Sequence, residues 1–522
     1  MKDRKSSVPV FKPYEPKQIQ LIPPTVDELI PADHLARVIN ATIDGMELES
    51  LFSTYEGGGA SSYNPVMLLK VLVYAYTQKV YSSRRIAKAI RENVVYMWLA
   101  GGNSPDFRTI NNFRSCHLKA CIQDVFSETV GMLVEEGYIG LKTYYVDGTK
   151  IEANANKYSF VWKRATDKFK ARLEAQIREI LDDVDKAVAE ENEEYGDRDL
   201  EELGGNGPIS SEKLKAVIGR INKKLASRAE AATELKKKLC TLETKELPRL
   251  AKYERQLEIV EDRKSYSKTD HDATFMGMKE DPMRNHQLKA AYNVQMGTED
   301  QFIVGFSIHQ KSTDTTCLIP HLKALKRSLG KLPPTIVADA GYGSEENYAF
   351  LEKKRIRAFV KYPMFRKEGE RSFKKQLYRK ENMPYEKEYD RYCCPEGRYL
   401  TFQEVRSVVH EHGHRSELRI YQGQGCGKCA QREACCSGEK NRSIQVNTNL
   451  DRLRARAKAR LESPEGLRLR SKRPVDVESV WGQIKQNRQF RRFMLRGLPK
   501  VQAEWGLVAL AHNMIKKQAA LA

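Results

Sequence analysis

Two short apolar runs, each ending in an aspartate, place the tightest limit on what this chain can fold into. The run Tyr144–Val146 leads into Asp147, and the run Thr335–Ala338 leads into Asp339. Short apolar runs bounded by turn signals are typical of buried strands. Because helical stretches lie between such runs, we predict a mixed α/β core. A third carboxylate, Glu478, opens a helical pattern further along the chain.

The three carboxylates suit one kind of chemistry. Hard cations such as Mg²⁺ or Mn²⁺ prefer oxygen ligands. A pair of these ions activates an attacking oxygen and stabilises a leaving oxygen in phosphoryl transfer. We therefore predict that Asp147, Asp339 and Glu478 are catalytic and bind the metal. Taken alone, each aspartate is more often a turn former or a helix cap, so the prediction depends on the three coming together.

The chain carries a strong positive excess. Its 522 residues give a formal net charge of +20 and a pI of about 9.3. This excess favours a polyanionic partner, with nucleic acid as the leading candidate, although a basic surface can also serve solubility alone. No run of about 18 apolar residues suggests a membrane span, and residues 1–20 contain no apolar signal core. We therefore expect a cytoplasmic protein without a membrane partner.

We predict a core that is interrupted twice. A hairpin pairs Lys289–Gln295 with Phe302–His309 through a turn at Gly297–Asp300, and helices and strands alternate after it. No repeat with a period of 20–50 residues is present. The predicted segments are an extended arm (1–29), a helical DNA-binding domain (30–138), a first core part (139–158), a charged helical insertion (159–265), a second core part (266–362), a basic cysteine-rich insertion (363–465) and a third core part (466–522).

Short capped helices with basic first turns characterise residues 30–138. Apolar residues from Met67 to Ala75 recur at helical spacing, and Ser82 and Asp106 stand where helix caps are expected. Such helices suit a helix-turn-helix-like DNA reader, and a small bundle with a charged face fits the pattern about equally well. The side chains that we expect to contact DNA here are Arg84, Arg85, Arg108 and Arg114.

Residues 159–265 are highly charged and helical in pattern. One apolar stripe runs from Phe169 to Val184 and another from Leu214 to Leu242, with a polar linker between them. This pattern predicts a helical hairpin or a short coiled coil. We expect its role to be structural or oligomeric.

Six of the ten cysteines lie between Cys393 and Cys436. Cys426 and Cys429 form a Cys-x-x-Cys knuckle, and the glycines beside it permit the turn with which two thiolates hold Zn²⁺. We predict a structural zinc site in a zinc-ribbon-like insertion, with Cys394 and Cys435 as the other two ligands. Two further cysteines could replace them and three histidines compete with them, namely Cys393, Cys436, His410, His412 and His414. Ordinary reduced thiols are the alternative.

Positive side chains crowd the predicted glutamate helix. Glu478 and Lys485 are seven residues apart, which places them two turns apart on one helix face. Arginines beside a carboxylate metal site are suited to phosphate contacts. We expect contacts with the DNA backbone from Arg473, Lys485, Arg488, Arg491 and Arg492.

Together these motifs resemble the Asp-Asp-Glu (DDE) transposases of bacterial insertion sequences, and in particular those with an InsH-like N-terminal domain. The resemblance spans nearly the whole chain. In the N-terminal part it rests on Ile30–Arg37, Tyr63–Pro65, Ser82–Ala87, Trp98–Gly102 and Pro105–Ile110. In the catalytic part it rests on Val146–Ala155, Asp339–Gly343, Val477–Lys485 and Phe490–Phe493.

The resemblance implies a ribonuclease-H-like core that uses Mg²⁺. It implies binding of terminal inverted repeats, cleavage at the element ends and joining of those ends to target DNA, by a homodimer or larger assembly in the bacterial cytoplasm at the nucleoid. Asp147 would bridge two ions, while Asp339 and Glu478 would each complete one. Water would attack first, and the freed 3′ hydroxyl would then attack the target phosphate, with Lys485 and Arg473 holding the donor backbone.

The chain departs from the related transposases at one point. Many of them carry a Tyr, an Arg, the Glu and a Lys along the last segment. Here Glu478 and Lys485 match, Arg473 matches but directly precedes Pro474, and no tyrosine matches. Two other functions stay open: a DNA-binding regulator derived from a transposase, which the presence of all three carboxylates opposes, and a metal-dependent nuclease that cuts without joining.

Overall fold

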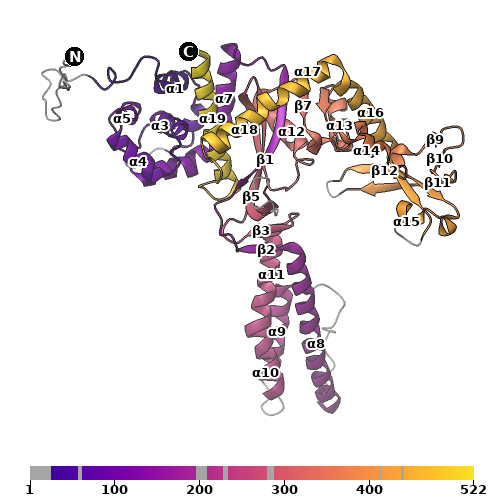
Figure 1. Ribbon diagram of the computed structural model, residues 1–522. Coiled ribbons are helices and arrows are strands. Elements are labelled where there is room, and N and C mark those ends of the chain that lie inside the picture. The colour runs from indigo at the N-terminus through magenta and orange to yellow at the C-terminus, as the bar shows by residue number, and fades with distance from the viewer. Residues whose placement is uncertain are drawn as a thin grey trace, which may run out of the picture.

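The computed structural model describes residues 25–56, 61–195, 209–226, 233–278, 287–410, 413–436 and 440–521. A mixed sheet lies at the centre of the molecule, with a helical domain on one side and a second sheet on the other (Figure 1). A long helical arm projects away from the central sheet. The predicted extended arm at 1–29 lies mostly outside the described residues.

The central sheet supplies the frame for the candidate site. Among the described residues its strands are β1 (Thr143–Glu152), β4 (Thr274–Gly277), β5 (Leu288–Glu299), β6 (Phe302–His309), β7 (Thr335–Ala338) and β8 (Arg357–Val360). Their order is β4-β5-β1-β7-β8, and β6 also pairs with β5. β1 is antiparallel to β5 and parallel to β7, and β7 is parallel to β8. This mixed sheet is compatible with the ribonuclease-H-like core that we expected.

The turn of the β5–β6 hairpin differs from the prediction. β5 continues to Glu299, and the turn consists of Asp300 and Gln301, whose φ angles are +51° and +68°. Positive φ at both central residues matches a two-residue hairpin turn. Gly297, which we expected in the turn, lies within β5 because Tyr144 packs against it: a Cβ there would stand 1.8 Å from the Tyr144 Cζ. Gly297 therefore allows Tyr144 to pack closely against β5.

Helices cover the sheet and carry the chain back to it. They are α12 (Leu318–Leu329), α13 (Glu345–Lys353), α16 (Thr448–Glu462), α17 (Pro464–Arg473) and α19 (Leu498–Leu521). α16 packs against β8 and α13, and its Leu453, Ala457 and Leu461 belong to the main core. The cysteine-rich insertion therefore ends before α16, some way short of residue 465, where we had placed its boundary.

The N-terminal domain is helical, as predicted. Its helices are α1 (Leu35–Asp44), α2 (Glu49–Phe52), α3 (Pro65–Thr77), α4 (Ser83–Glu92), α5 (Val94–Leu99), α6 (Phe107–Asn112) and α7 (Leu118–Glu135). The apolar run from Met67 to Ala75 is largely buried in α3, and Asp106 caps α6 through the Thr109 N–H at 2.7 Å. Ser82 stands at the start of α4 without a side-chain capping bond. α19 packs against α3, α7 and β6, so this domain and the sheet share one hydrophobic core.

The helical insertion forms the projecting arm. A short pair of strands, β2 (Phe160–Trp162) and β3 (Ser265–Ser267), stands at its base. Its helices are α8 (Lys163–Tyr195), α9 (Ser211–Ala226), α10 (Thr233–Thr241) and α11 (Leu247–Val260). Leu173, Ile177, Leu214 and Ile218 bury a core of their own, which confirms the two apolar stripes, although Phe169 near the base is half exposed.

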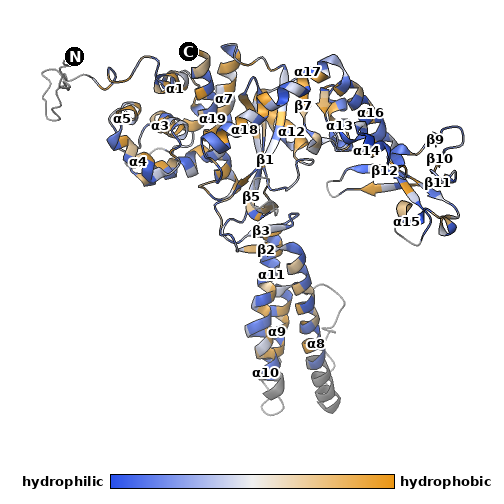
Figure 2. Cartoon of the chain, viewed as in Figure 1, coloured by the Kyte–Doolittle hydropathy of each residue, from blue (hydrophilic) through white to orange (hydrophobic). Residues whose placement is uncertain are grey.

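The cysteine-rich insertion forms a second sheet. Its antiparallel strands are β9 (Tyr385–Glu386), β10 (Arg391–Cys393), β11 (Tyr399–Val409), β12 (Arg415–Gly423) and β13 (Ser443–Val446), accompanied by the short helices α14 (Arg371–Lys374) and α15 (Arg432–Cys435). Hydrophilic residues cover much of this sheet, in contrast to the apolar central strands (Figure 2). Within the described chain, none of the helices combines the length and apolarity needed to cross a bilayer.

Candidate active site

Asp147 and Asp339 stand side by side on neighbouring strands. The parallel pairing of β1 with β7 ends at Val146 and Ala338, so the next residue on each strand is the aspartate. We predicted Asp147 at a strand end, but β1 continues to Glu152 because β5 pairs with it along that length. Asp147 therefore occupies the middle of a long strand, at the point where its parallel neighbour stops.

The backbone fixes the Asp339 carboxylate. Asp339 Oδ1 accepts a hydrogen bond from the Gly341 N–H at 2.9 Å, at the start of a short 3₁₀ turn, Ala340–Tyr342. The Thr315 hydroxyl donates to the Gly341 carbonyl at 2.8 Å, which ties this turn to the segment before α12. The Asp339 carboxylate thus caps this turn through Oδ1.

Glu478 lies in the middle of a continuous helical stretch. We predicted that it opens a helix, but α17 leads directly into π-helical turns at Pro474–Glu478 and Gln483–Asn487, with α18 (Ser479–Gly482) between them. Pro474 has no N–H to donate, and the wide turn is closed instead by the Ser479 N–H, which bonds to the Pro474 carbonyl. Such π turns are rare and occur often at functional sites.

Arg473 joins two of the three carboxylates. Its Nη2 lies 2.9 Å from Asp147 Oδ1, and its Nη1 donates to Glu478 Oε1 at 2.6 Å. The side chain is only 7% exposed, whereas that of Glu478 is 51% exposed. Because the π turn spans one residue more than an α turn, residues five apart face the same side. This places Arg473 against Glu478 although Pro474 separates them.

Asp476 fastens the glutamate helix to the sheet. It is 1% exposed and accepts hydrogen bonds from the Thr298 hydroxyl at 2.7 Å and from the Asp300 N–H at 3.1 Å. Burial raises the pKa of this carboxyl, and the hydrogen bonds from the Thr298 hydroxyl and the Gln301 N–H oppose the rise. The bonds hold the turn of the β5–β6 hairpin against the helical turn that carries Glu478.

Two of the basic residues expected to touch DNA are buried instead. The Lys485 ammonium donates to the Thr149 hydroxyl on β1, and Arg488 approaches His512 Nδ1 at 3.4 Å. Both residues are 7% exposed, and burial lowers the pKa of Arg488 to about 10. They pack the glutamate helix against the core, whereas Arg491 and Arg492 are exposed.

Asp314 is a carboxylate that the sequence analysis missed. Its Oδ1 accepts hydrogen bonds from Asn293 Nδ2 and Gln295 Nε2, both at 2.9 Å. A Cβ placed on Gly148 would stand 2.6 Å from this same oxygen, so Asp314 lies over the residue that follows Asp147. No sequence signal separates it from the polar residues around it, because only the packing of β5 beside β1 brings it to the site.

The three aspartates share one electrostatic environment. The hydroxyl of Tyr342, which follows Asp339, donates to Gln295 Oε1. Burial is the largest cause that raises its pKa well above the usual range, and the next causes are the charges of Asp314, Asp147 and Asp339.

Lys361 is a second cation beside this group of carboxylates. Burial lowers the pKa of Lys361, at the exit of β8, and the charges of Arg473 and Arg470 lower it further. The site therefore contains carboxylates together with donors for an anionic group.

The donor set suits a hard divalent ion, but the carboxylates do not yet converge on one. In the described part of the chain, no three His, Cys, Asp or Glu side chains gather closely enough to hold an ion as they stand. Arg473 occupies the space between Asp147 and Glu478. An ion that entered this site would take over the neutralising role of that guanidinium.

A second group of predicted residues meets in the N-terminal domain. The guanidinium groups of Arg84 and Arg108 lie 4.7 and 5.7 Å from the centroid of the Phe107 ring, and the three side chains line an open pocket of about 530 Å³. Arg85 is exposed on α4. Arg114 differs from the prediction because it is 3% exposed and donates to the Tyr76 hydroxyl at 3.0 Å, within the domain interior.

Two further aspartates, Asp270 and Asp272, bind backbone N–H groups. Asp270 Oδ1 accepts from the Gly497 N–H at 3.1 Å, and Asp272 Oδ2 accepts from the Leu498 N–H at 2.7 Å. They cap the start of α19. The four predicted zinc-binding cysteines lie together in the second sheet, apart from this site.

Two protein-family models match the chain. A model described as "Transposase DDE domain" matches residues 393–517, which include Arg473 and Glu478. A model described as "Transposase domain (DUF772)" matches residues 24–116, which include α1 to α6. Asp147 and Asp339 lie outside both matched stretches, and neither a curated protein nor a solved structure matches the chain. The chain therefore contains a stretch similar to a transposase domain near each end, and the one nearer the C-terminal end is similar to a DDE domain.

Proposed function

We propose that this protein is a DNA transposase that binds the terminal inverted repeats of its element, cleaves the element ends and joins them to target DNA by metal-dependent phosphoryl transfer. One observation carries the proposal. The sheet register places Asp147 beside Asp339, and Arg473 links Asp147 to Glu478. Three carboxylates that are 192 and 139 residues apart in the sequence (339 − 147 and 478 − 339) are thus connected, through strand pairing and Arg473, in one region of the central sheet.

Asp147, Asp339 and Glu478 would hold Mg²⁺ or Mn²⁺, with Asp147 placed to contribute to both ions. When bound, such ions activate the attacking oxygen and stabilise the leaving oxygen. The half-exposed Glu478 is the carboxylate with most freedom to move toward an ion. Asp339 is held by the Gly341 N–H through one oxygen, which leaves the other oxygen for coordination.

Arg473 would change partners during the reaction. In the structure it neutralises Asp147 and Glu478. With that charge supplied by bound ions, the guanidinium would be free to bind a phosphate, for which its planar fork of donors is well suited. Lys361 lies near enough to feel the charges of Asp339 and Glu478 and would add a second positive charge beside the DNA backbone. We assign to Lys485 the role of holding the helix against β1.

Asp314 would supply a fourth carboxylate. Its Oδ1 is engaged by two amide groups, and its Oδ2 takes no hydrogen bond from the described residues. That second oxygen would lie 3.7 Å from a Cβ on Gly341, the glycine whose N–H donates to Asp339. We assign Asp314 as an additional ligand, directly or through water, of the ion nearest Asp339.

DNA contacts outside the catalytic centre would come from exposed arginines. Arg84, Arg85 and Arg108 are exposed in the N-terminal domain, and Arg491 and Arg492 are exposed after the glutamate helix. The Tyr81 hydroxyl donates to the Arg488 carbonyl at 2.8 Å, so the two surfaces are physically connected. We propose that the N-terminal group reads the element end and that the second group holds the adjoining backbone.

The test uses full-length protein and a duplex that carries the terminal repeats found beside the gene. Asp147→Asn, Asp339→Asn and Glu478→Gln should each lower Mg²⁺-dependent cleavage by at least about 10³-fold, the scale on which removal of one essential electrostatic group acts. Binding of the duplex should change less than about twofold, because phosphate contacts and metal ligands are separate. Glu243→Gln, an exposed glutamate at the arm, is the matched control.

The outcomes separate the three candidate functions. Wild-type protein that binds but never cleaves would be a regulator. Cleavage without transfer of the 3′ end to a supercoiled target would indicate a nuclease. Metal-dependent cleavage that survives in Asp147→Asn would remove the proposed catalytic centre.

A further inference from the structure

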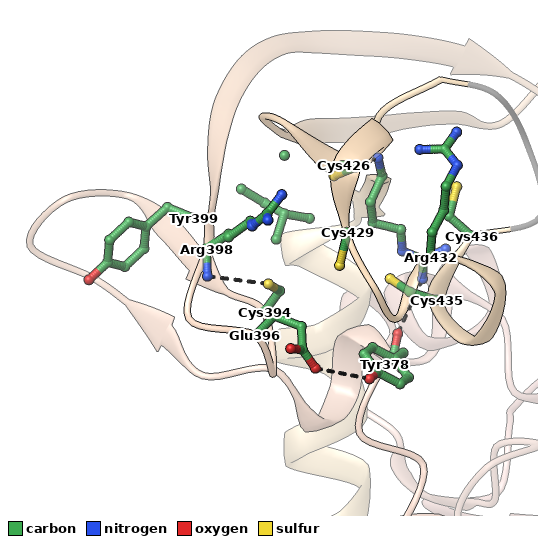
Figure 3. Close-up of a pocket in the computed structure, with 13 residues that line it drawn as sticks. Tyr378, Cys394, Glu396, Arg398, Tyr399, Cys426, Cys429, Arg432, Cys435 and Cys436 are labelled. Atoms are coloured by element: carbon green, nitrogen blue, oxygen red, sulfur yellow. Dashed lines mark hydrogen bonds between the residues drawn. The ribbon is translucent and has the colours of Figure 1, made fainter.

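The cysteines of the second sheet surround a very small cavity. It has a volume of about 30 Å³, and its lining includes the side chains of Cys394, Cys426, Cys429, Cys435 and Cys436. Figure 3 shows the thiols of Cys394, Cys429 and Cys435 turned toward the same space. A volume of this size accommodates about one water molecule. The lining thiols come from three segments of the chain that are separated in sequence, and the space between them suits a single ion.

Backbone N–H groups already point at two of these sulfurs. The Arg398 N–H donates to Cys394 Sγ at 3.3 Å, and the Arg442 N–H donates to Cys426 Sγ at 3.4 Å. Hydrogen bonds of this kind fix the position of a potential metal ligand. Gly425, just before the knuckle, has a φ of +67°, a conformation that other residues adopt only with strain. The local backbone therefore holds both sulfurs in place.

The domain that carries the thiols has little else to stabilise it. Its buried apolar cluster consists of Met383, Leu400, Tyr421, Ile444 and Val446. Small domains with so thin a core usually depend on disulfides or a bound metal. All ten cysteines are free in the structure. Metal binding is therefore the remaining device that could contribute folding free energy to this sheet.

The positions of the other candidate zinc ligands exclude them from this cavity. His410 and His414 lie at the other end of the sheet, where His410 contacts the Ser416 hydroxyl at 3.0 Å and His414 approaches Glu345 at 3.6 Å. His412 lies outside the described residues. The Cys393 thiol donates to the Cys394 carbonyl at 3.5 Å, and it is not part of the cavity lining.

We infer that Cys394, Cys426, Cys429 and Cys435 bind one structural Zn²⁺ ion. Each thiol would give up its proton to solvent, and four sulfurs would leave no open position for catalysis. Since no three of these side chains stand at ligand distance in the structure, the sulfurs must close on the ion by rotation about their Cα–Cβ bonds. This inference does not depend on the proposed transposase activity.

The experiment measures metal in the full-length protein, purified reduced and without chelator. Wild type should contain about one zinc per chain, by the one-ion, four-ligand rule. Cys394→Ser, Cys426→Ser, Cys429→Ser and Cys435→Ser should each lose it. Cys393→Ser is the matched control within the domain, and Cys240→Ser in the arm is the control outside it; both should retain the ion.

A cobalt substitution provides a second readout. Protein stripped of zinc and treated with Co²⁺ should show the strong visible absorption of a tetrahedral thiolate site, and added Zn²⁺ should abolish it. Limited proteolysis should cut the stripped protein between β9 and β13 faster than the loaded protein. Absence of both zinc and the cobalt absorption in reduced wild type would overturn the inference. Loss of zinc in Cys436→Ser but not in Cys435→Ser would overturn the assignment of Cys435.

Discussion

The charge of the Asp314 side chain can be removed by substitution while its shape is kept. Its Oδ1 holds the amides of Asn293 and Gln295, while its Oδ2 is the oxygen that we assign to the metal site. An asparagine at this position keeps an oxygen for the two amide donors. It replaces only the second oxygen with an NH₂ group, so the substitution isolates the contribution of the charge.

We expect Asp314→Asn to weaken Mn²⁺ binding by about 10- to 100-fold, the range seen when residues supporting a metal site are changed. Cleavage should fall by a similar factor at low Mn²⁺ and recover in part at high Mn²⁺. The melting temperature without metal should stay within about 2 °C, because the amide network is kept. Mn²⁺ titration by calorimetry and a cleavage series over Mn²⁺ concentration provide the check. Unchanged Mn²⁺ affinity would leave Asp314 with a packing role only.

Single residues also show what could and could not be predicted from the sequence. Asp147, Asp339 and Glu478 carry a local signal, because each stands at the boundary of an apolar run or helical pattern. Arg114, Lys485 and Arg488 carry the same positive charge as the exposed arginines, yet all three are buried. Whether a basic side chain faces solvent depends on elements distant in sequence, such as Tyr76 for Arg114. The residue type alone cannot report that.

At the scale of elements, α4 and α6 present one basic aromatic surface. Arg84 lies in the first turn of α4, Phe107 and Arg108 begin α6, and the two guanidinium groups lie 4.7 and 5.7 Å from the centroid of the Phe107 ring. Contacts of this kind limit the freedom of both arginines before any ligand binds. Preordered arginines lose less entropy when they meet a phosphate or a base.

Arg84→Ala and Arg108→Ala should each weaken binding of the element-end duplex, by about 1–3 kcal/mol if the arginine contacts a base. If it contacts a phosphate, the slope of log K against log salt should fall by about one. Arg91→Ala, an exposed arginine at the other end of α4, should leave both quantities unchanged. Fluorescence anisotropy at several salt concentrations, with the repeat and a scrambled duplex, measures the effect. Equal losses in all three variants would contradict recognition by this surface.

The glutamate helix shows why element boundaries escape the sequence. The helical pattern in the sequence predicts a helix that opens at Glu478, and a proline such as Pro474 is normally found in the first turn of a helix. The structure instead runs the helix through Pro474 by widening one turn. That widening depends on Asp476 and Arg473 bonding to distant strands. These bonds form between parts of the chain far apart in sequence, and no local pattern encodes them.

At the scale of the whole molecule, one hydrophobic core joins the N-terminal helices to the catalytic sheet. Three histidines are buried in or beside it. His321 contacts the Tyr144 hydroxyl and the Ser307 hydroxyl, each at 2.8 Å, and His512 contacts the Gln301 carbonyl at 2.8 Å. Burial lowers the pKa of His321 and His512 to about 3 and that of His309 to about 4. All three are therefore neutral in the folded protein at ordinary pH.

The stability that His321 provides should decline on acidification. Below pH 6.5 the unfolded chain takes up a proton on this histidine, while the folded chain does not until about pH 3. The unfolded state is thus favoured by about 1.4 kcal/mol per pH unit in that window, or about 2 kcal/mol at pH 5. Urea unfolding of wild type and His321→Gln at pH 8, 6.5 and 5 should show the difference in unfolding free energy shrinking by this amount.

The control for that comparison is the exposed His271. His271→Gln should unfold in parallel with wild type at all three pH values. A constant gap between wild type and His321→Gln from pH 8 to 5 would contradict the neutral, buried state of His321.

The order of domains was predictable at this scale, but their joining was not. The helical domain, the arm and the cysteine-rich segment each show their own composition. In the structure the arm and the cysteine-rich segment have hydrophobic clusters of their own, whereas the helical domain shares the core of the central sheet. α19 shows little periodic pattern because it is buried on nearly all sides, between α3, α7 and β6. Gly506 permits this close approach, since a Cβ there would stand 2.2 Å from Ile122 Cγ1. A helix that is buried on nearly all sides shows no amphipathic pattern from which its packing partners could be predicted.

The position of α19 has a consequence for biosynthesis. α19 packs against α3 and α7 although it is synthesised long after them. About 420 residues separate the end of α3 from the start of α19 (498 − 77), so at about 5 to 20 residues per second the early helices wait roughly 20 to 85 s for their partner. Throughout that interval their apolar faces are open to aggregation or to a chaperone. A gene truncated before Leu498 should therefore yield an insoluble fragment in place of a free DNA-reading domain.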